Sequence, residues 1–370
     1  MKFQVQPQEL LRRITQCQRA ISTRTPMPIL ECIRFDARDG SLTLMATDLE
    51  LSITTRLACD VMEEGVVVLP ATMIGNIFRK LPAAPATVQE KNGVVEITCR
   101  DSRFRLQVQN PDEFPILQNV ETDEVSEVAN DALMRAIQET EFATSIDESK
   151  IALTGIYLER RQQSLRFVAL DGYRLALHDI LLGEGAMDYE KDCIVPKRAM
   201  IELSRILDPA ETAALRATET HIEVESGDIT LSSRLIDKNY IDYEQIISLD
   251  HETKVVVDRQ SLRDAVERAS LLTQAERAHL IKLKVKSDGL YIESNAEIGE
   301  VNEYVPLEEM DGEELLIAFN AKYLLDGIRA LDSEKLVLTL NGSLNPMIVR
   351  PLEDPDHALY LVLPVRIAGE

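Results

Sequence analysis

The sequence repeats one short pattern three times: a bulky apolar residue, then Pro or Asn, then the first residue of an amphipathic stretch. The three copies are Leu69-Pro70-Ala71, Val195-Pro196-Lys197 and Phe319-Asn320-Ala321. Successive copies lie 126 and 124 residues apart, and three units of about that size fill the 370 residues of the chain. Such a period predicts a fold built by internal repetition.

Each unit has the same predicted order: a short strand, a helix, several strands of alternating apolar residues, a second helix and further strands. The six predicted helices span residues 7–20, 71–81, 131–142, 197–207, 258–269 and 320–331. This order predicts an α+β fold in which each unit lays two helices on one face of an antiparallel sheet. Three unrelated α+β domains are the alternative, but order, spacing and helix-opening chemistry all recur and favour repetition.

Two changes in composition mark where the units meet. Thr122-Asp123-Glu124 is an acidic link, and residues 248–253 are mostly polar. We therefore predict an N-terminal domain at 1–122, a central domain at 126–247 and a C-terminal domain at 253–370.

Composition also indicates the compartment. No apolar run is long enough to cross a membrane, and the first ten residues lack the apolar stretch of a secretory signal. The cysteines are odd in number and have no CxxC spacing: Cys17, Cys32, Cys59, Cys99 and Cys193. We expect a protein of the reducing cytoplasm, without disulfides or a zinc site.

The motifs of common enzyme sites are absent. The sequence contains neither a GxxxxGK[ST] phosphate loop nor a GxSxG nucleophile turn. Its five histidines lie far apart and have no metal-ligand spacing. We therefore predict no catalytic residue, no metal and no cofactor.

Charge is divided unequally between the predicted helices and the rest of the chain. The net charge of −23 by itself argues against nucleic-acid binding, yet the six predicted helices sum to +5 and the remainder to −28. Apolar residues at helical spacing, such as Leu10, Ile14, Cys17 and Ile21, are expected to pack on the sheet and leave the cations outward. The contrast favours a shared basic helical surface on an acidic body. The charges of any one helix alone are those of an ordinary solvent-exposed face.

Many local strings, in order along the whole chain, resemble the bacterial beta sliding clamp, the beta subunit of DNA polymerase III. The first unit has Pro28-Ile29-Leu30 and Thr47-Asp48-Leu49-Glu50, and the second has Asp171-Gly172-Tyr173-Arg174-Leu175. The final strand, Leu363-Pro364-Val365-Arg366-Ile367, is similar to the MPMRL-type ending of that family.

The resemblance implies an architecture and a function. Three similar clamp domains per chain would join head to tail with those of a second chain, giving a homodimeric ring with pseudo-sixfold symmetry. Helices would face duplex DNA and sheets would form the outside. The ring would act as a processivity factor that tethers the replicative polymerase, is opened by a clamp loader, and serves repair and mismatch-repair proteins.

The resemblance also implies sequence-independent contacts to DNA phosphates. The residues expected to make them are Arg24, Arg79, Lys80, Lys150, Lys197 and Arg198. Thr72 and Met73 stand where relatives have cations, and Ile151 and Ala152 where some relatives have aromatic residues that stack on single-stranded bases. Contact with single strands is therefore in doubt.

The contact between subunits is expected to join the first domain of one chain to the third domain of the other. The residues that match it are Arg103, Phe104, Arg105, Leu106, Leu271, Leu272, Glu300 and Glu303. Burial inside a single domain is the alternative explanation for the two leucines.

Partners of the family bind through short peptides, in a pocket at the second and third domains. The matching positions are Leu153, Leu170, Gly172, Tyr173, Arg174, Leu175, Ile241, Gln245, Ile246, Leu361, Leu363, Pro364, Val365, Arg366 and Ile367. Aliphatic walls with a few polar groups suit extended-peptide recognition. Ile241 and Gln245 replace a Pro and an Arg of relatives, which predicts a more apolar pocket with an altered peptide preference.

Four other functions compete with the main interpretation. A DNA-metabolising enzyme needs a site that the sequence does not offer. A sequence-specific DNA binder needs a helix or strand that reads a groove, and the helices here are patterned to pack. A sequence-blind DNA-binding scaffold, or a specialised second clamp without a main replicative role, stays open.

Overall fold

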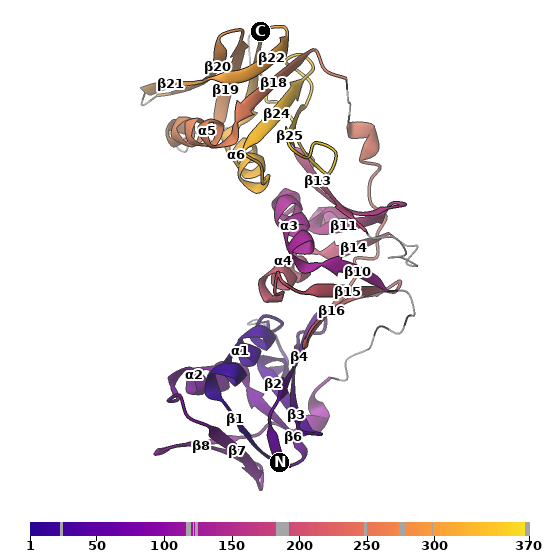
Figure 1. The fold of residues 1–370 in the computed structure, drawn as a ribbon, viewed down its shortest axis with the longest axis vertical. Helices are drawn as coiled ribbons and strands as arrows, with labels where there is room; N and C mark the ends of the chain where they lie inside the picture. Colours follow the sequence, from indigo (N-terminus) through magenta and orange to yellow (C-terminus); the bar gives the residue numbers. More distant parts are fainter. Residues whose placement is uncertain are drawn as a thin grey trace. The chain divides into compact units, whose positions relative to one another are not determined.

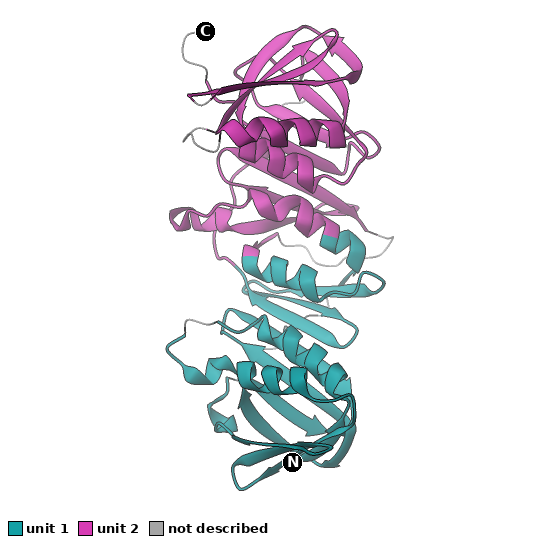
Figure 2. Ribbon diagram, turned by 90° about the vertical axis from the view of Figure 1, so that its left-hand side faces the viewer, with its two compact units in different colours: residues 1–134, 185–190, 198–235 teal, residues 135–184, 191–197, 236–370 magenta. Residues whose placement is uncertain are grey.

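The computed structural model describes residues 1–22, 25–115, 120, 122, 125–182, 192–247, 250–273, 279–297 and 299–366. They form two compact units (Figure 2). Unit 1 comprises residues 1–134, 185–190 and 198–235, and unit 2 comprises residues 135–184, 191–197 and 236–370. The division therefore falls inside the predicted central repeat.

The described residues contain six α-helices, and all six predicted helices are confirmed with ends within four residues. They are α1 (Pro7–Gln18), α2 (Ala71–Lys80), α3 (Asn130–Thr140), α4 (Lys197–Ile206), α5 (Arg259–Thr273) and α6 (Ala321–Ala330). The repeated marker is the point where a strand passes directly into the second helix of each repeat. Pro70 and Pro196 end their strands, and Asn320 caps α6 by accepting a hydrogen bond of 2.9 Å from the backbone N–H of Lys322.

Unit 1 contains two antiparallel sheets (Figure 1). The five-stranded sheet has the order β5 (Asp60–Glu63), β1 (Lys2–Val5), β7 (Ala86–Lys91), β8 (Val94–Cys99), β9 (Ser102–Gln107). The eight-stranded sheet has the order β10 (Ser126–Ala129), β15 (Thr212–Ala217), β16 (His221–Ser226), β17 (Ile229–Arg234), β4 (Leu51–Ala58), β3 (Ser41–Thr47), β2 (Cys32–Arg38), β6 (Gly65–Pro70).

Unit 2 is built in the same way. Its nine-stranded sheet has the order β14 (Cys193–Pro196), β11 (Gly155–Arg160), β12 (Ser164–Leu170), β13 (Arg174–Leu181), β26 (Ala358–Val362), β25 (Met347–Pro351), β24 (Lys335–Leu340), β18 (Thr253–Asp258), β22 (Leu307–Gly312). Its four-stranded sheet has the order β21 (Gly299–Val305), β20 (Gly289–Ala296), β19 (Leu280–Lys286), β23 (Leu315–Asn320).

Helices cover one face of the sheets in each unit. In unit 1, α1 and α2 lie beside each other, and Leu10, Ile14 and Cys17 are fully buried as their spacing predicts. In unit 2, α5 and α6 form the matching pair. Removing an aliphatic face of this kind from water supplies about 25 cal/mol per Å² of apolar surface.

The two long sheets join one repeat to the next by the same rule. In unit 1, β17, the last strand of the central repeat, pairs with β4, the third strand of the antiparallel run in the first repeat. In unit 2, β26, the last strand of the third repeat, pairs with β13, which holds the position of β4 in the central repeat. Each junction is therefore continuous antiparallel sheet, which covers strand edges that would otherwise be exposed.

Candidate binding sites

One face of the nine-stranded sheet carries an apolar cluster where β13 meets β26. Its buried members are Leu153, Val168, Leu170, Leu175, Leu177, Tyr243, Ile348, Leu359 and Leu361. Strand register explains the gathering, because Leu170 is opposite Leu175, Leu175 is opposite Leu361, and Leu361 is opposite Ile348. Four residues predicted for the partner pocket, Leu153, Leu170, Leu175 and Leu361, are thus brought together from segments nearly 200 positions apart.

The turn between β12 and β13 lies beside this cluster and is shaped by Asp171 and Gly172. The Asp171 carboxylate accepts hydrogen bonds from the backbone N–H groups of Tyr173 and Arg174, at 2.8 and 3.1 Å. Gly172 has a φ of +97°, a conformation that side chains disfavour. The turn leaves Tyr173 exposed, with its ring stacked on Tyr323 of α6 at 5.8 Å between centroids.

Arg174 points to the other face of the sheet and is only 9% exposed. Its guanidinium donates hydrogen bonds to Asp171 at 3.0 Å, to Asp326 of α6 at 2.6 Å and to the carbonyl oxygen of Phe142 at 2.8 Å. The guanidinium also lies over the rings of Tyr323 and Phe142, at 4.6 and 5.4 Å from their centroids. Burial lowers the pKa of Arg174, but the hydrogen bond to Asp326 and the charges of Tyr360, Asp171 and Asp326 together outweigh it, and the net shift is upward. Arg174 therefore ties β13 to α6 and offers little surface to a ligand.

The other predicted pocket residues lie around the cluster with varied exposure. Ile241, Gln245, Ile246, Leu363 and Arg366 are exposed, and Pro364 and Val365 are half-buried. The last segment is held by backbone hydrogen bonds from Leu363 to the Tyr173 carbonyl and from Val365 to the Ala318 carbonyl, at 2.9 and 2.8 Å. Ile367 lies outside the described residues. Exposed apolar side chains beside a buried aliphatic patch are typical of a peptide-binding surface.

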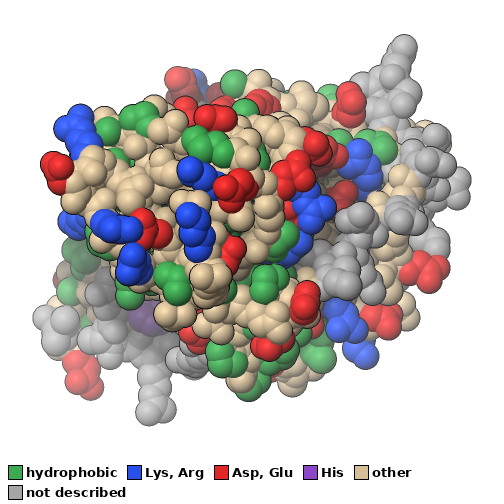
Figure 3. Space-filling view, turned by 90° about the horizontal axis from the view of Figure 1, so that it is seen from below, with side chains coloured by type: hydrophobic (Ala, Val, Ile, Leu, Met, Phe, Trp, Pro, Cys, Tyr) green, Lys and Arg blue, Asp and Glu red, His purple; other side chains and the backbone are tan. Residues whose placement is uncertain are grey.

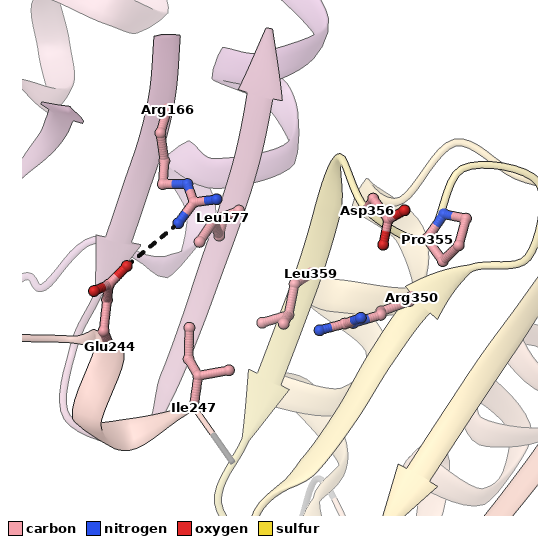
Figure 4. A pocket seen from close by; sticks show the side chains of 8 residues that line it. All are labelled: Arg166, Leu177, Glu244, Ile247, Arg350, Pro355, Asp356 and Leu359. Atoms are coloured by element: carbon pink, nitrogen blue, oxygen red, sulfur yellow. Dashed lines mark ion pairs between the residues drawn. The ribbon is translucent and has the colours of Figure 1, made fainter. Parts of the chain in front are cut away.

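A pocket of about 270 Å³ continues the cluster along the same face, and the sequence did not predict it (Figure 4). Its lining comprises Arg166, Leu177, Glu244, Ile247, Arg350, Pro355, Asp356 and Leu359. The period of two along β13 and β26 was a usable signal, since Leu177 and Leu359 each stand two residues from a predicted member. No sequence pattern singles out Arg350, because its position depends on how β25 joins the sheet.

The predicted DNA-binding cations do not share one environment. Arg79 and Lys80 are exposed at the end of α2, where Arg79 donates to the Asn76 side chain at 2.7 Å. Lys150 is exposed beside the β12–β13 turn, with its Nζ 3.6 Å from where a Cβ of Gly172 would lie. Lys197 is ion-paired with Glu141 at 2.8 Å. Arg24 lies outside the described residues.

Among the predicted DNA-binding cations, Arg198 has contacts to two residues of the first repeat. It is ion-paired with Asp48 and donates to the Arg19 carbonyl at 3.2 Å, while Arg19 is paired with Glu202 of α4 at 2.8 Å. These contacts link α4 to the first repeat. On the face drawn in Figure 3, lysine and arginine side chains lie among aspartate and glutamate side chains.

The predicted interface residues lie at two sheet edges. On β9, Arg103 and Arg105 are exposed and both pair with Glu96, at 2.6 and 3.0 Å, while Phe104 and Leu106 are half-buried. Near the other edge, Leu272 is half-buried and Leu271 is 64% exposed at the end of α5. On β21, Glu300 is exposed, and Glu303 accepts two bonds from Arg268, at 2.9 and 2.7 Å. Leu271 is thus not a core residue of its own repeat.

Among the described residues, no group of three or more His, Cys, Asp or Glu side chains is placed to hold a metal ion. In the part of the chain that the structure describes, no helix is long and apolar enough to cross a membrane.

Comparison with known families and structures places the fold. Three family models match consecutive stretches: the N-terminal domain of the DNA polymerase III beta subunit at 1–118, its central domain at 127–242 and its C-terminal domain at 244–366. The beta sliding clamp of Bacillus subtilis is 31% identical over 378 residues, which cover 99% of this chain and all of that one.

Solved structures agree along the full length. The crystal structure of the DNA polymerase sliding clamp from Bacillus subtilis has a TM-score of 0.95 at 31% identity and covers 99% of both chains. A sliding clamp from Pseudomonas aeruginosa bound to griselimycin has a TM-score of 0.94 at 28% identity, covering 99% of this chain and all of that one. The fold is thus that of three-domain sliding clamps. The chain belongs to the DNA polymerase III beta subunit family.

Proposed function

We propose that this protein is a DNA sliding clamp, a homodimeric ring in the cytoplasm that encircles duplex DNA. It tethers the replicative polymerase and other DNA-processing proteins, and it has no catalytic activity of its own. Membership of the family supports this function. The observation that carries it is the way the repeats join, because the same rule can close two chains into a ring.

The two junctions inside the chain leave two strands unpaired, one at each of two sheet edges. Both junctions pair the last strand of one repeat with the third antiparallel strand of the preceding repeat, as β17 does with β4 and β26 with β13. β9 is the last strand of the first repeat, and β21 is the third antiparallel strand of the third repeat. Each lies at the edge of its sheet. A head-to-tail contact between chains would pair them, and such contacts either close or run on as filaments.

The register of the internal junctions can be transferred to this outer one. Ser232 of β17 lies opposite Ser52 of β4. Ser232 occupies the position of Arg105 within its repeat, and Ser52 occupies that of Glu300. Arg105 would then face Glu300 of the partner subunit. One step along, Phe104 would face Val301 of the partner subunit, so that opposite charges and apolar side chains meet across the joint.

Charge exchange tests this register. The variant Arg105→Glu places two carboxylates opposite each other and should raise the dimer dissociation constant by about tenfold or more at low salt. Combining it with Glu300→Arg should restore most of the affinity, as measured by sedimentation equilibrium. Arg105→Glu variants that dimerise like the unmodified protein would contradict the register.

The sequence-independent grip on DNA is also a proposal. Arg79, Lys80 and Lys150 are exposed cations available to phosphate, while Lys197 and Arg198 would have to exchange their present carboxylate partners for it. Such contacts are weak without topological linkage and weaken steeply with salt.

The partner site would be the apolar cluster with its rim of Tyr173, Ile241, Ile246 and Leu363. Aliphatic side chains of a partner peptide would add to the cluster, and the exposed backbone around the last segment would orient it. Ile241 and Gln245 are exposed, so both would be accessible to the peptide and would alter its preference.

One experiment separates a ring from a binder. The protein is loaded on nicked circular DNA by its clamp loader, isolated, and the DNA is then cut once. A topological clamp stays on the circle and is lost from the linear form within minutes. Equal retention on both forms would reject the proposed function and favour a sequence-blind scaffold.

A further inference from the structure

The pocket next to the apolar cluster has a different composition from the cluster itself. Strand alternation places Arg166 on the same face as Val168, Leu177 on the same face as Leu175, and Arg350 on the same face as Ile348. The pocket is therefore the next row of the same sheet surface. Its aliphatic side chains lie in the middle, between Arg166 and Glu244 on one side and Arg350 and Asp356 on the other (Figure 4).

Two of the charged side chains in this pocket already have partners. Arg166 donates two hydrogen bonds to Asp179, at 2.7 and 2.6 Å. Glu244 is ion-paired with Arg161 and lies 3.8 Å from Arg166, the pair drawn in Figure 4. Asp356 lies on the loop before β26 and is solvated. None of these groups needs a ligand to complete its interactions.

Arg350 differs from all of them. Its side chain projects from β25 toward Leu359, its Nε is buried without a hydrogen-bond partner, and no described residue forms an ion pair with it. Burial lowers the pKa of Arg350, and the charge of Asp356 opposes that effect without reversing it. A partly buried guanidinium without an acceptor is costly, and a carboxylate that binds it in the same pocket would remove that cost.

We propose that this pocket binds an acidic side chain of the same partner peptide whose aliphatic side chains occupy the apolar cluster, with the carboxylate on Arg350. The inference rests on the proposed function and extends it to peptide specificity. At about 270 Å³ the pocket is smaller than most small-molecule sites, and it suits a side chain whose backbone lies outside. Asp356 and Glu244 also line it, so a singly charged carboxylate is tolerated better than a doubly charged phosphate.

A peptide panel measures this preference. The synthetic peptides all contain one Gln and a pair of Leu or Phe residues, which serve as anchors for the apolar cluster. They carry either Glu or Gln at each flanking position in turn. At one position, the Glu peptide should bind about tenfold more tightly than its Gln counterpart at low salt, since hydrogen bonds between charged groups have that strength. The preference should disappear in Arg350→Gln. It should grow in Asp356→Asn, because that change removes a competing carboxylate.

Matched controls keep the result specific. Lys286→Gln removes the same charge from β19, on another sheet of unit 2, and should preserve the preference. The uncharged peptide should bind to Arg350→Gln within about twofold of its normal affinity, which also reports that the variant is folded.

Three outcomes would overturn the inference. The first is equal affinity for Glu and Gln peptides at every position, and the second is a preference that survives in Arg350→Gln. The third is an Arg350→Gln variant that binds all peptides normally and loses only its affinity for a phosphate-bearing oligonucleotide. Failure of the uncharged anchor peptide to bind the unmodified protein would instead reject the partner site of the proposed function. The two failures are thus distinguishable.

Discussion

Replacing Arg174 by Met should destabilise unit 2 strongly although it preserves most of the side-chain volume. The change removes three hydrogen bonds and leaves Asp171, Asp326 and the Phe142 carbonyl without their cation. Removing one partner of a buried ion pair costs about 3–5 kcal/mol. The side chains of Asp171 and Asp326 are 13% and 24% exposed, so water replaces part of the lost interaction. We expect a loss of about 2–4 kcal/mol in the free energy of unfolding.

Urea unfolding followed by circular dichroism measures this loss, and hydrogen exchange of the β26 amides shows where it occurs. Because Arg174 joins β13 to α6 and β13 pairs with β26, those amides should exchange faster in Arg174→Met. Peptide affinity should fall only by the fraction of molecules in which the junction between β13 and α6 has opened.

The control for this prediction is Arg234→Met, which removes an exposed arginine that lies 3.5 Å from Glu50. It should change stability by less than about 0.5 kcal/mol. A double-mutant cycle of Arg174→Met with Asp326→Asn should be non-additive, because each change removes the same 2.6 Å contact. A loss below about 1 kcal/mol in Arg174→Met, or full additivity, would refute this account of the junction.

Three further predictions concern assembly, DNA and pH. Replacing Leu271 by Ala together with Leu272 by Lys should give folded monomers by sedimentation, and a stable dimer would show that this interface is misplaced. Replacing both Arg79 and Lys80 by Ala should lower the slope of log affinity against log salt by about 2 for duplex DNA, whereas an unchanged slope would remove both from the DNA-binding surface. Burial raises the pKa of Glu139, but hydrogen bonds with His178 and Arg135 outweigh it and hold the pKa below 4.5. That carboxylate should therefore contribute stability above pH 4.5 that is lost as the pH falls further, so Glu139→Gln should show a weaker acid dependence of its urea midpoint.

Local signals predicted the helices and the repeat correctly. Each second helix begins directly after Pro70, Pro196 or Asn320, because proline cannot donate to a continuing strand and the Asn side chain caps free N–H groups. Apolar spacing in α1 predicted its buried face for the same reason, since a 3.6-residue period leaves one side to pack.

Roles that depend on pairing between distant strands were harder to predict. The family resemblance predicts Arg174 as a pocket residue, and that role stays a prediction. What the local sequence does not indicate is that its side chain also reaches Asp326 of α6. The contact of Arg198 with DNA likewise stays a prediction, and the structure adds its ion pair with Asp48, 150 positions earlier in the chain. Neither partner is visible from local sequence.

The sequence by itself determined the number of repeats, the helices, the aliphatic faces and the family, because periodicity and local strings carry that information. Only the tertiary structure decided the register of β25 against β26. That register places Arg350 in the same pocket as Leu359, with its buried Nε lacking a hydrogen-bond acceptor. The tertiary structure also decided that β9 and β21 are the strand edges of their sheets. The physical reason is that register in an antiparallel sheet is set jointly by turns, packing and partner strands, so residues far apart in sequence acquire their neighbours only when the whole sheet forms.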